Sequence, residues 1–134
     1  MTERYARVLV VEDDPDLRLL VQHVLDPVGD VIGVPDVYQA LAALQSDRFD
    51  VIVLDLIFPG ASGFDLMERL ASLAIATPVV ILTGLASDLA VRRARSLGAH
   101  AFVTKPFDVD LFVVTVRGAI VGSDHVRDPR SVLA

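Results

Sequence analysis

Acidic residues follow two apolar segments of this sequence, and their spacing predicts a site for a divalent cation. Glu12, Asp13 and Asp14 come directly after one apolar run, and Asp55 comes directly after another. Carboxylates that converge on one crevice repel each other, so either one of them takes up a proton or a cation lies between them. Because no His or Cys lies nearby, the oxygen ligands favour a hard ion such as Mg²⁺. For Asp13 or Asp14 alone, the alternative is that the carboxylate caps the helix expected to begin at Pro15.

A hydroxyl and an ammonium group stand at the ends of two further apolar runs. Thr83 is followed by Gly84, which leaves room beside the hydroxyl, and Lys105 is followed by Pro106. Lys105 is the only Lys among 12 basic residues, and its compact charge on a flexible stem suits a phosphoryl oxygen better than the stiff guanidinium of Arg. A carboxylate nucleophile, a metal ion, a hydroxyl and an ammonium group are the parts of phosphoryl transfer onto an aspartate.

Alternating strands and helices must position these groups. The expected strands are residues 7–11, 31–34, 51–54, 78–82 and 101–104. The expected helices are residues 15–25, 36–44, 62–73, 87–97 and 108–121, and residues 59–60 are expected to form a loop. Strands that are apolar along their whole length belong to a sheet covered on both faces. Their alternation with helices predicts parallel strands with right-handed crossovers.

The predicted fold is therefore α/β, a (βα)5 doubly wound five-stranded parallel sheet with helices on both faces. A flavodoxin-like strand order, 2-1-3-4-5, would place the first and third strands side by side at a switch point. Ligands of such folds bind beyond the carboxyl ends of the strands at that point. The acidic residues stand at those two ends.

Four motifs at these strand ends resemble the receiver domain of two-component response regulators, of the stand-alone, chemotaxis-regulator-like type. They are Val-Leu-Val-Val-Glu-Asp-Asp-Pro-Asp-Leu-Arg, Val-Ile-Val-Leu-Asp-Leu-Ile-Phe-Pro-Gly-Ala-Ser-Gly, Val-Ile-Leu-Thr-Gly and Lys-Pro-Phe. The resemblance covers about residues 6–121, nearly the whole chain.

The resemblance implies that Asp55 accepts a phosphoryl group from a phosphohistidine of a histidine kinase or histidine phosphotransfer protein. It also implies a Mg²⁺ site formed by Glu12, Asp13, Asp55 and the main-chain carbonyl of Ile57. In that site Asp13 is the direct ligand, Glu12 acts through water, and Asp14 has an outer role at most. A phosphoacceptor of this kind is a signalling domain that assists its own phosphorylation and dephosphorylation, and it is not an enzyme.

The resemblance also implies a switch. Thr83 and Lys105 would contact the phosphoryl oxygens, and the Lys105–Pro106 peptide bond is expected to be cis. Phe102 stands where the family has an aromatic residue that swings inward as the Thr moves. Because Phe102 has no hydroxyl to bond outside, we expect its inward position to be favoured even without phosphorylation; the alternative is a Phe that simply packs in the core. Apolar Ile57 and Leu85 replace the polar residues often found in fast-cycling relatives, which predicts a long-lived aspartyl phosphate.

The last predicted helix is apolar on more than one face. One row has i, i+4 spacing and suits the core, and it consists of Phe112, Val116 and Ile120. A second row is displaced around the helix, and it consists of Leu111, Val114 and Val121. A helix apolar on two faces buries two faces, so we expect the second row to dock a downstream protein or another copy of the chain. The alternative is that residues 123–134 cover it.

Composition limits the remaining function classes. The chain has 134 residues, a net charge of −6, no Cys and 53% hydrophobic residues. These values exclude disulfides and thiolate zinc sites and argue against disorder and a basic nucleic-acid surface. The longest uncharged stretch, residues 70–87, contains Pro and Gly and does not predict a membrane span. The first apolar run is too short for a signal peptide, so we expect a cytoplasmic protein that binds neither nucleic acid nor membranes.

The expected organisation is a receiver domain over residues 1–122 and a polar tail over residues 123–134. Such a single-domain response regulator would signal through residues 87–121 by protein–protein contact or phosphorelay. Two alternatives within the family are a degenerate receiver that docks without phosphorylation and a receiver fragment of a larger hybrid kinase. A haloacid-dehalogenase-type phosphatase would need a second Asp at position 57, which is Ile, and a flavin-binding module would need a Ser/Thr/Gly-rich loop where this chain is acidic.

Overall fold

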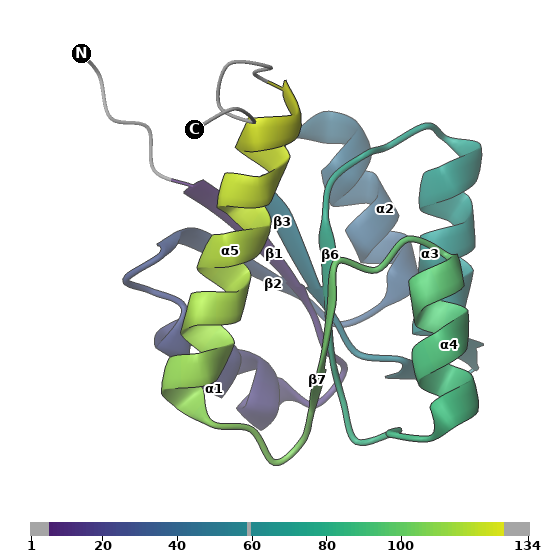
Figure 1. Ribbon diagram of the computed structural model, residues 1–134, viewed down its shortest axis with the longest axis horizontal. Coiled ribbons are helices and arrows are strands. Elements are labelled where there is room, and N and C mark those ends of the chain that lie inside the picture. Colours follow the sequence, from purple (N-terminus) through teal and green to yellow (C-terminus); the bar gives the residue numbers. More distant parts are fainter. Residues whose placement is uncertain (1–5, 59, 128–134) are drawn as a thin grey trace.

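A five-stranded parallel sheet forms the centre of the protein (Figure 1). The computed structural model describes residues 6–58 and 60–127, with side chains described up to residue 120. The sheet strands are β1 (Ala6–Val11), β2 (Gly29–Val34), β3 (Val51–Leu54), β6 (Val79–Thr83) and β7 (Ala101–Thr104). Their spatial order is β2-β1-β3-β6-β7, and every neighbouring pair is parallel. This confirms the predicted doubly wound order.

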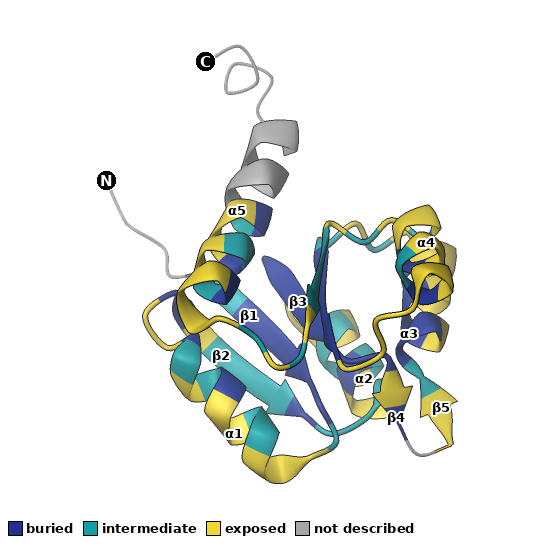
Figure 2. Cartoon of the chain, turned by 60° about the horizontal axis from the view of Figure 1, so that its bottom comes forward, coloured by how far each residue is buried: buried dark blue, intermediate teal, exposed yellow. Residues whose placement is uncertain are grey.

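Helices cover both faces of this sheet, as predicted. The helices α1 (Pro15–Val24) and α5 (Val109–Arg127) lie on one face (Figure 1). The other face carries α2 (Val37–Ser46), α3 (Gly63–Ser72) and α4 (Asp88–Ser96). Successive strand residues point to opposite faces, so Leu9 packs in the α2–α3–α4 layer and Val10 in the α1–α5 layer. The central strands are therefore buried on both sides (Figure 2).

The strands of a short hairpin, which the sequence does not predict, flank the loop expected at residues 59–60. The strands β4 (Ile57–Phe58) and β5 (Ala61–Ser62) pair in antiparallel fashion. Gly60 has a φ of 77°, a left-handed conformation that Gly adopts without steric penalty and that lets the chain reverse. Phe58 is only 8% exposed and packs in the α2–α3–α4 layer. This packing anchors the hairpin, which the sequence prediction missed.

The last helix is longer than the sequence predicts. Its expected end was Val121, whereas α5 continues through Gly122 to Arg127, so that prediction is wrong. A single Gly inside a helix is tolerated at a cost of about 1 kcal/mol relative to Ala. The division of the chain at residue 122 stays a prediction, and residues 128–134 lie outside the described part. The other predicted elements agree with the structure to within two residues at each end.

None of the helices in residues 6–58 and 60–127 has both the length and the apolar character needed to cross a membrane.

Candidate functional site

The strand register brings the predicted site residues to one edge of the sheet. Val11 of β1 pairs with Leu54 of β3, so the acidic residues that follow each strand lie next to each other. The backbone N–H of Asp55 donates to the carbonyl of Val11 at 3.2 Å. The same pattern continues across the sheet, where the N–H of Lys105 donates to the carbonyl of Thr83 at 2.9 Å. Parallel strands thus bring the four predicted motifs together at one edge of the sheet.

Asp55 is held by hydrogen bonds to both of its carboxylate oxygens. The Nζ of Lys105 donates to Oδ2 at 2.8 Å, and the hydroxyl of Thr83 donates to Oδ1 at 2.7 Å. The N–H of Ile57 also donates to Oδ1, at 3.2 Å. Lys105 reaches a second carboxylate as well, because its Nζ lies 2.8 Å from Oε1 of Glu12. The ammonium and hydroxyl predicted to face the acidic cluster therefore contact it directly.

Burial and charge act in opposite directions on the ionisable groups of this site. Burial would raise the pKa of Asp55, but hydrogen bonds from Lys105 and Thr83 outweigh it, so the pKa lies below its usual range. Burial dominates at Glu12 and raises the pKa of that carboxyl group, despite the hydrogen bond from Lys105. Burial would lower the pKa of Lys105, but the two carboxylates outweigh it and raise that pKa. Asp55 is thus kept ionised beside a fixed cation.

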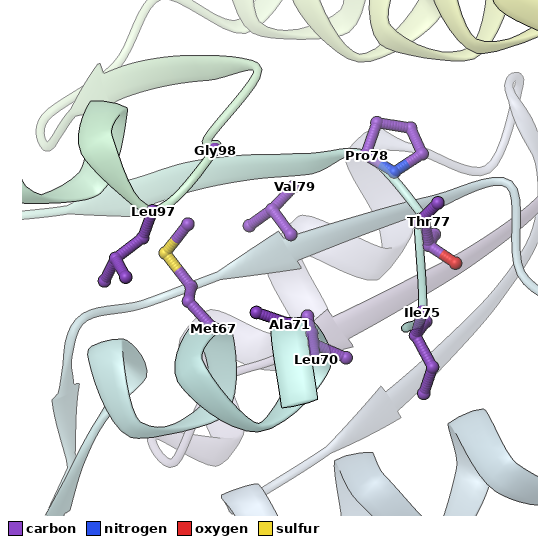
Figure 3. A pocket seen from close by; sticks show the side chains of 10 residues that line it. Met67, Leu70, Ala71, Ile75, Thr77, Pro78, Val79, Leu97 and Gly98 are labelled. Atoms are coloured by element: carbon purple, nitrogen blue, oxygen red, sulfur yellow. The ribbon is translucent and has the colours of Figure 1, made fainter. Parts of the chain in front are cut away.

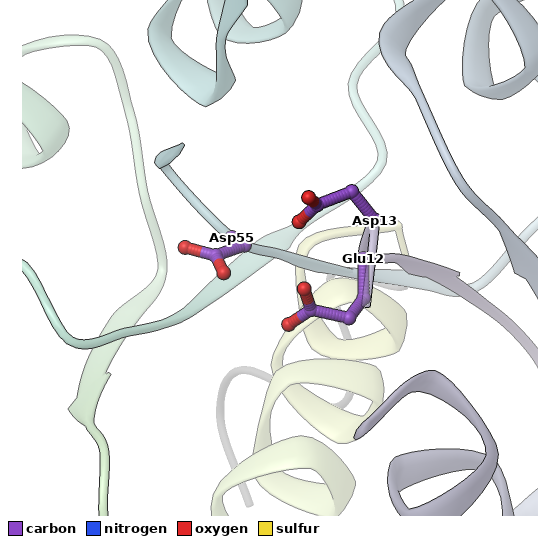
Figure 4. Close-up of side chains that lie close together, drawn as sticks. All are labelled: Glu12, Asp13 and Asp55. Carbon is purple, nitrogen blue, oxygen red and sulfur yellow. The ribbon is translucent and has the colours of Figure 1, made fainter. Parts of the chain in front are cut away.

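The acidic cluster fits a hard divalent cation. Glu12, Asp13 and Asp55 each offer a carboxylate oxygen, and these atoms lie within 4.8 Å of one another. The three side chains come from the ends of β1 and β3 and point the same way (Figure 4). Glu12 and Asp55 are buried, whereas Asp13 is more exposed. An all-oxygen donor set with one solvent-accessible carboxylate suits Mg²⁺, which keeps several of its waters. The main-chain carbonyl of Ile57 as a further ligand stays a prediction.

Asp14 does not belong to the metal-binding cluster but caps a helix. Its side chain accepts hydrogen bonds from the N–H groups of Asp16 and Leu17, at 3.0 and 3.3 Å. This is the N-cap arrangement of α1, and it is the alternative that the sequence left open for this residue. The N–H of Asp14 in turn donates to Oε2 of Glu12 at 3.2 Å. The cap therefore helps to fix the Glu12 side chain.

Two residues that position the site were not predicted from the sequence. The guanidinium of Arg18 donates to the carbonyl of Glu12 at 2.9 Å. The N–H of Gly63, the first residue of α3, donates to the carbonyl of Leu56 at 2.9 Å. A Cβ atom built on Gly63 would lie 2.2 Å from the carbonyl oxygen of Asp55. The lack of a side chain thus lets α3 begin directly against the backbone of Asp55.

The residues predicted for the switch and the partner surface have distinct environments. The Lys105–Pro106 peptide bond is cis, as predicted. Phe102 is partly buried and packs against the α2–α3–α4 layer, which is compatible with both interpretations, so its role in a switch stays a prediction. In α5, Phe112 and Val116 are fully buried and the second row is exposed, with Leu111 at 62% and Val114 at 63%. The side chain of Val121 lies outside the described ones.

A comparison with protein families identifies a receiver domain. Residues 8–117 match the model of the response regulator receiver domain. Among curated proteins, the transcriptional regulatory protein CiaR of Streptococcus pneumoniae is 38% identical over 122 residues, which cover 91% of this chain and 54% of the relative. The transcriptional regulatory protein TrcR of Mycobacterium tuberculosis is 35% identical over 126 residues, which cover 92% of this chain and 48% of the relative.

The chain thus spans about half the length of these curated relatives. A longer one, the sensory/regulatory protein RpfC of Xanthomonas campestris, is 28% identical over 97% of this chain, which covers 19% of the relative. Since several relatives are named transcriptional regulators, the absence of nucleic-acid binding stays a prediction.

Solved structures agree with the family match. The chemotaxis protein CheY4 of Vibrio cholerae has a TM-score of 0.79 and 32% identity, and the match covers 87% of this chain and 99% of that one. The receiver domain of the Francisella response regulator 1452 has a TM-score of 0.82 and 28% identity, and the match covers 88% of this chain and 98% of that one. Both match almost their full length, so the likeness concerns one complete domain of this fold.

Proposed function

This chain belongs to the response regulator receiver domain family, and we propose that Asp55 accepts a phosphoryl group from a phosphohistidine of a histidine kinase or phosphotransfer protein. The proposal rests on the contacts that hold the Asp55 carboxylate in place. A buried carboxylate receives Lys105 on one oxygen and Thr83 on the other, at 2.8 and 2.7 Å. Donors in these positions can move from the carboxylate onto the charged oxygens of an incoming phosphoryl group without a large rearrangement.

The transfer step follows from these contacts. A carboxylate oxygen of Asp55 attacks phosphorus, the P–N bond to the imidazole breaks, and the imidazole nitrogen leaves with the electron pair. The lowered pKa of Asp55 keeps this nucleophile ionised at neutral pH. Lys105 and Thr83 then stabilise the negative charge on the phosphoryl oxygens. In this proposal the chain is a phosphoacceptor that assists its own phosphorylation and dephosphorylation, not an enzyme.

Glu12, Asp13 and Asp55 would hold Mg²⁺, together with the carbonyl of Ile57. The ion would supply positive charge that lowers the repulsion between the acidic cluster and a phosphoryl group. Lys105 alone cannot do this, because its ammonium already pairs with Glu12 and Asp55, and Asp13 adds a third carboxylate to the cluster. Within this arrangement Glu12 orients Lys105 through their 2.8 Å ion pair, while the more exposed Asp13 remains open to solvent ligands.

The proposed output surface is formed by α4, β7 and α5. Phosphorylation would draw Thr83 toward the phosphoryl group and Phe102 inward, and this would change the surface that signals by protein–protein contact or phosphorelay. The exposed Leu111 and Val114 of α5 would contact a downstream protein or a second copy of the chain. If this row is the interface, Leu111→Asp abolishes partner binding or dimerisation of the phosphorylated protein without lowering its phosphorylation.

Phosphorylation by a small acyl phosphate, read by intact mass, tests the function directly. We expect a single phosphoryl group on the wild type in Mg²⁺ and none in EDTA. Asp55→Asn should abolish the label, whereas Asp30→Asn, which removes an exposed carboxylate at the start of β2, should leave it unchanged. An unlabelled wild type would identify a degenerate receiver that only docks, and a label that survives Asp55→Asn would refute the assignment of the acceptor.

A further inference from the structure

The helix α4 is weakly anchored to the rest of the fold. Its nine residues bury only Ala90 and Ala94, and alanine side chains remove little apolar area from water. By contrast, α3 buries the larger side chains of Phe64, Leu66 and Met67. The outer surface of α4 is almost entirely exposed (Figure 2). Contacts other than apolar burial must therefore contribute to its position.

Arg93 supplies such contacts between α4 and α3. The guanidinium carbon of Arg93 lies 4.3 Å from the centre of the Phe64 ring, and its Nη2 lies 3.1 Å from Oε1 of Glu68. Phe64 and Glu68 are four residues apart, so they lie on one face of α3, one above the other. A single side chain of α4 thus stacks on a ring and pairs with a carboxylate of the same neighbouring helix. We call these two contacts the Arg93 bridge.

The Arg93 bridge ends close to the acceptor. Phe64 is 6% exposed and directly follows Gly63, whose backbone packs against the carbonyl of Asp55. The ring on which Arg93 stacks is therefore fixed to the chain segment that carries the acceptor. At the other end of the helix pair, a cavity of about 150 Å³ lies between α3, β6 and the end of α4 (Figure 3). Leu97 and Met67 are among its walls, so the end of α4 borders space that no side chain fills.

We propose that Arg93 is a positioning residue that holds α4 against α3 in the unphosphorylated protein and thereby opposes the change caused by phosphorylation. This inference rests on the function proposed above. A contact that stabilises one arrangement lowers the affinity of any ligand that favours the other, by the same factor. Loss of the Arg93 bridge should therefore raise the affinity for a phosphoryl group or its stand-in. The expected factor is about twofold to fivefold, which is what an exposed cation–π contact and a surface ion pair contribute.

Beryllium fluoride with Mg²⁺, a stand-in for the phosphoryl group, provides the test by calorimetric titration. We expect Arg93→Gln to bind beryllium fluoride about twofold to fivefold more tightly than the wild type. Arg93→Lys, which keeps the charge but loses the planar group that stacks, should lie between them. Arg92→Gln is the matched control, since it removes the same charge from an exposed neighbouring position, and it should bind like the wild type.

A second measurement separates positioning from simple stability. Without ligand, amide hydrogens of α4 should exchange faster in Arg93→Gln than in Arg92→Gln. If Arg93→Gln unfolds at a lower temperature but binds beryllium fluoride no more tightly than the wild type, Arg93 is only structural and the inference is overturned. Failure of the wild type to bind beryllium fluoride at all would instead refute the proposed function, and the inference with it.

Discussion

Replacing Gly63 by Ala tests whether the acceptor is held by the start of α3. A Cβ atom at this position would lie 2.2 Å from the carbonyl oxygen of Asp55 and 2.9 Å from the Cα atom of Leu56. Real Cβ atoms essentially never approach other heavy atoms within 3.0 Å, so the carbonyl or the helix must move by at least 0.8 Å, the difference between 3.0 and 2.2 Å. Both obstructing groups are backbone, and they cannot rotate away as a side chain would.

The expected loss of stability follows from this geometry. Forcing one methyl group into a packed site typically costs about 1–3 kcal/mol. The upper half of that range applies because the displacement also lengthens the hydrogen bond from the N–H of residue 63 to the carbonyl of Leu56. The displacement acts on the segment that carries Asp55, so the contacts of Asp55 with Lys105 and Thr83 are strained as well. Phosphorylation by an acyl phosphate should therefore slow by about tenfold or more, because an error of 1 Å in a reacting group costs up to about a hundredfold.

Urea unfolding in metal-free buffer and the phosphorylation rate together give the readout. Gly118→Ala is the matched control, because nothing lies within 4 Å of a Cβ built there and the residue lies inside α5. That change should stabilise the protein by about 0.5–1 kcal/mol and leave phosphorylation unchanged. The reasoning would be refuted if Gly63→Ala unfolds within about 0.5 kcal/mol of the wild type, the usual limit for surface substitutions, and is phosphorylated at the same rate.

Three further predictions concern single groups of the site. Lys105 is the only lysine, so ¹³C-lysine labelling gives one signal, which should titrate above the ordinary lysine pKa of 10.5 in metal-free buffer. Because this pKa is raised in the folded protein, the contribution of Lys105 to stability is complete below pH 10.5 and is lost as the pH rises through the folded value. A pKa that Asp55→Asn leaves unchanged would contradict the ion pair. Polar substitutions of Ile57 and Leu85, which come two residues after Asp55 and Thr83, should shorten the lifetime of the aspartyl phosphate. Loss of the phosphoryl group from the wild type within seconds in Mg²⁺ would disprove the long lifetime. Asp14→Ala should lower the free energy of unfolding by about 1 kcal/mol through loss of the α1 cap, and an unchanged urea midpoint would count against that role.

The convergence of the site could be predicted from the sequence because it depends on a single rule. Glu12, Asp55, Thr83 and Lys105 each stand at the end of an apolar run, and parallel strands place their carboxyl ends at one edge. The register confirms this, since Val11, which precedes Glu12, pairs with Leu54, which precedes Asp55. No knowledge of loop paths was needed for these four residues.

The supporting residues could not be predicted because their contacts depend on how separate elements pack. Arg18 donates from α1 back to the carbonyl of Glu12, which directly follows β1. Gly63 matters through an approach of two backbones, which leaves no signal in residue type beyond the glycine itself. Arg93 meets Phe64 and Glu68 across two helices, 25 residues from Glu68 in sequence. Such contacts follow from tertiary packing and not from local spacing.

The net charge of the site depends on the carboxylates that the sequence predicts, and their positions depend on supporting residues that it does not predict. The three acidic groups of Glu12, Asp13 and Asp55 outnumber the single ammonium of Lys105, and counted as fully charged they leave a formal charge of −2. Burial disfavours this excess charge, and the raised pKa of Glu12 reflects that burial. A divalent cation matches the excess, whereas a phosphoryl group without one would add to it. Arg18, the Asp14 cap and Gly63 contact the backbone or side chains around this cluster, so the fold holds the carboxylates close together despite their repulsion.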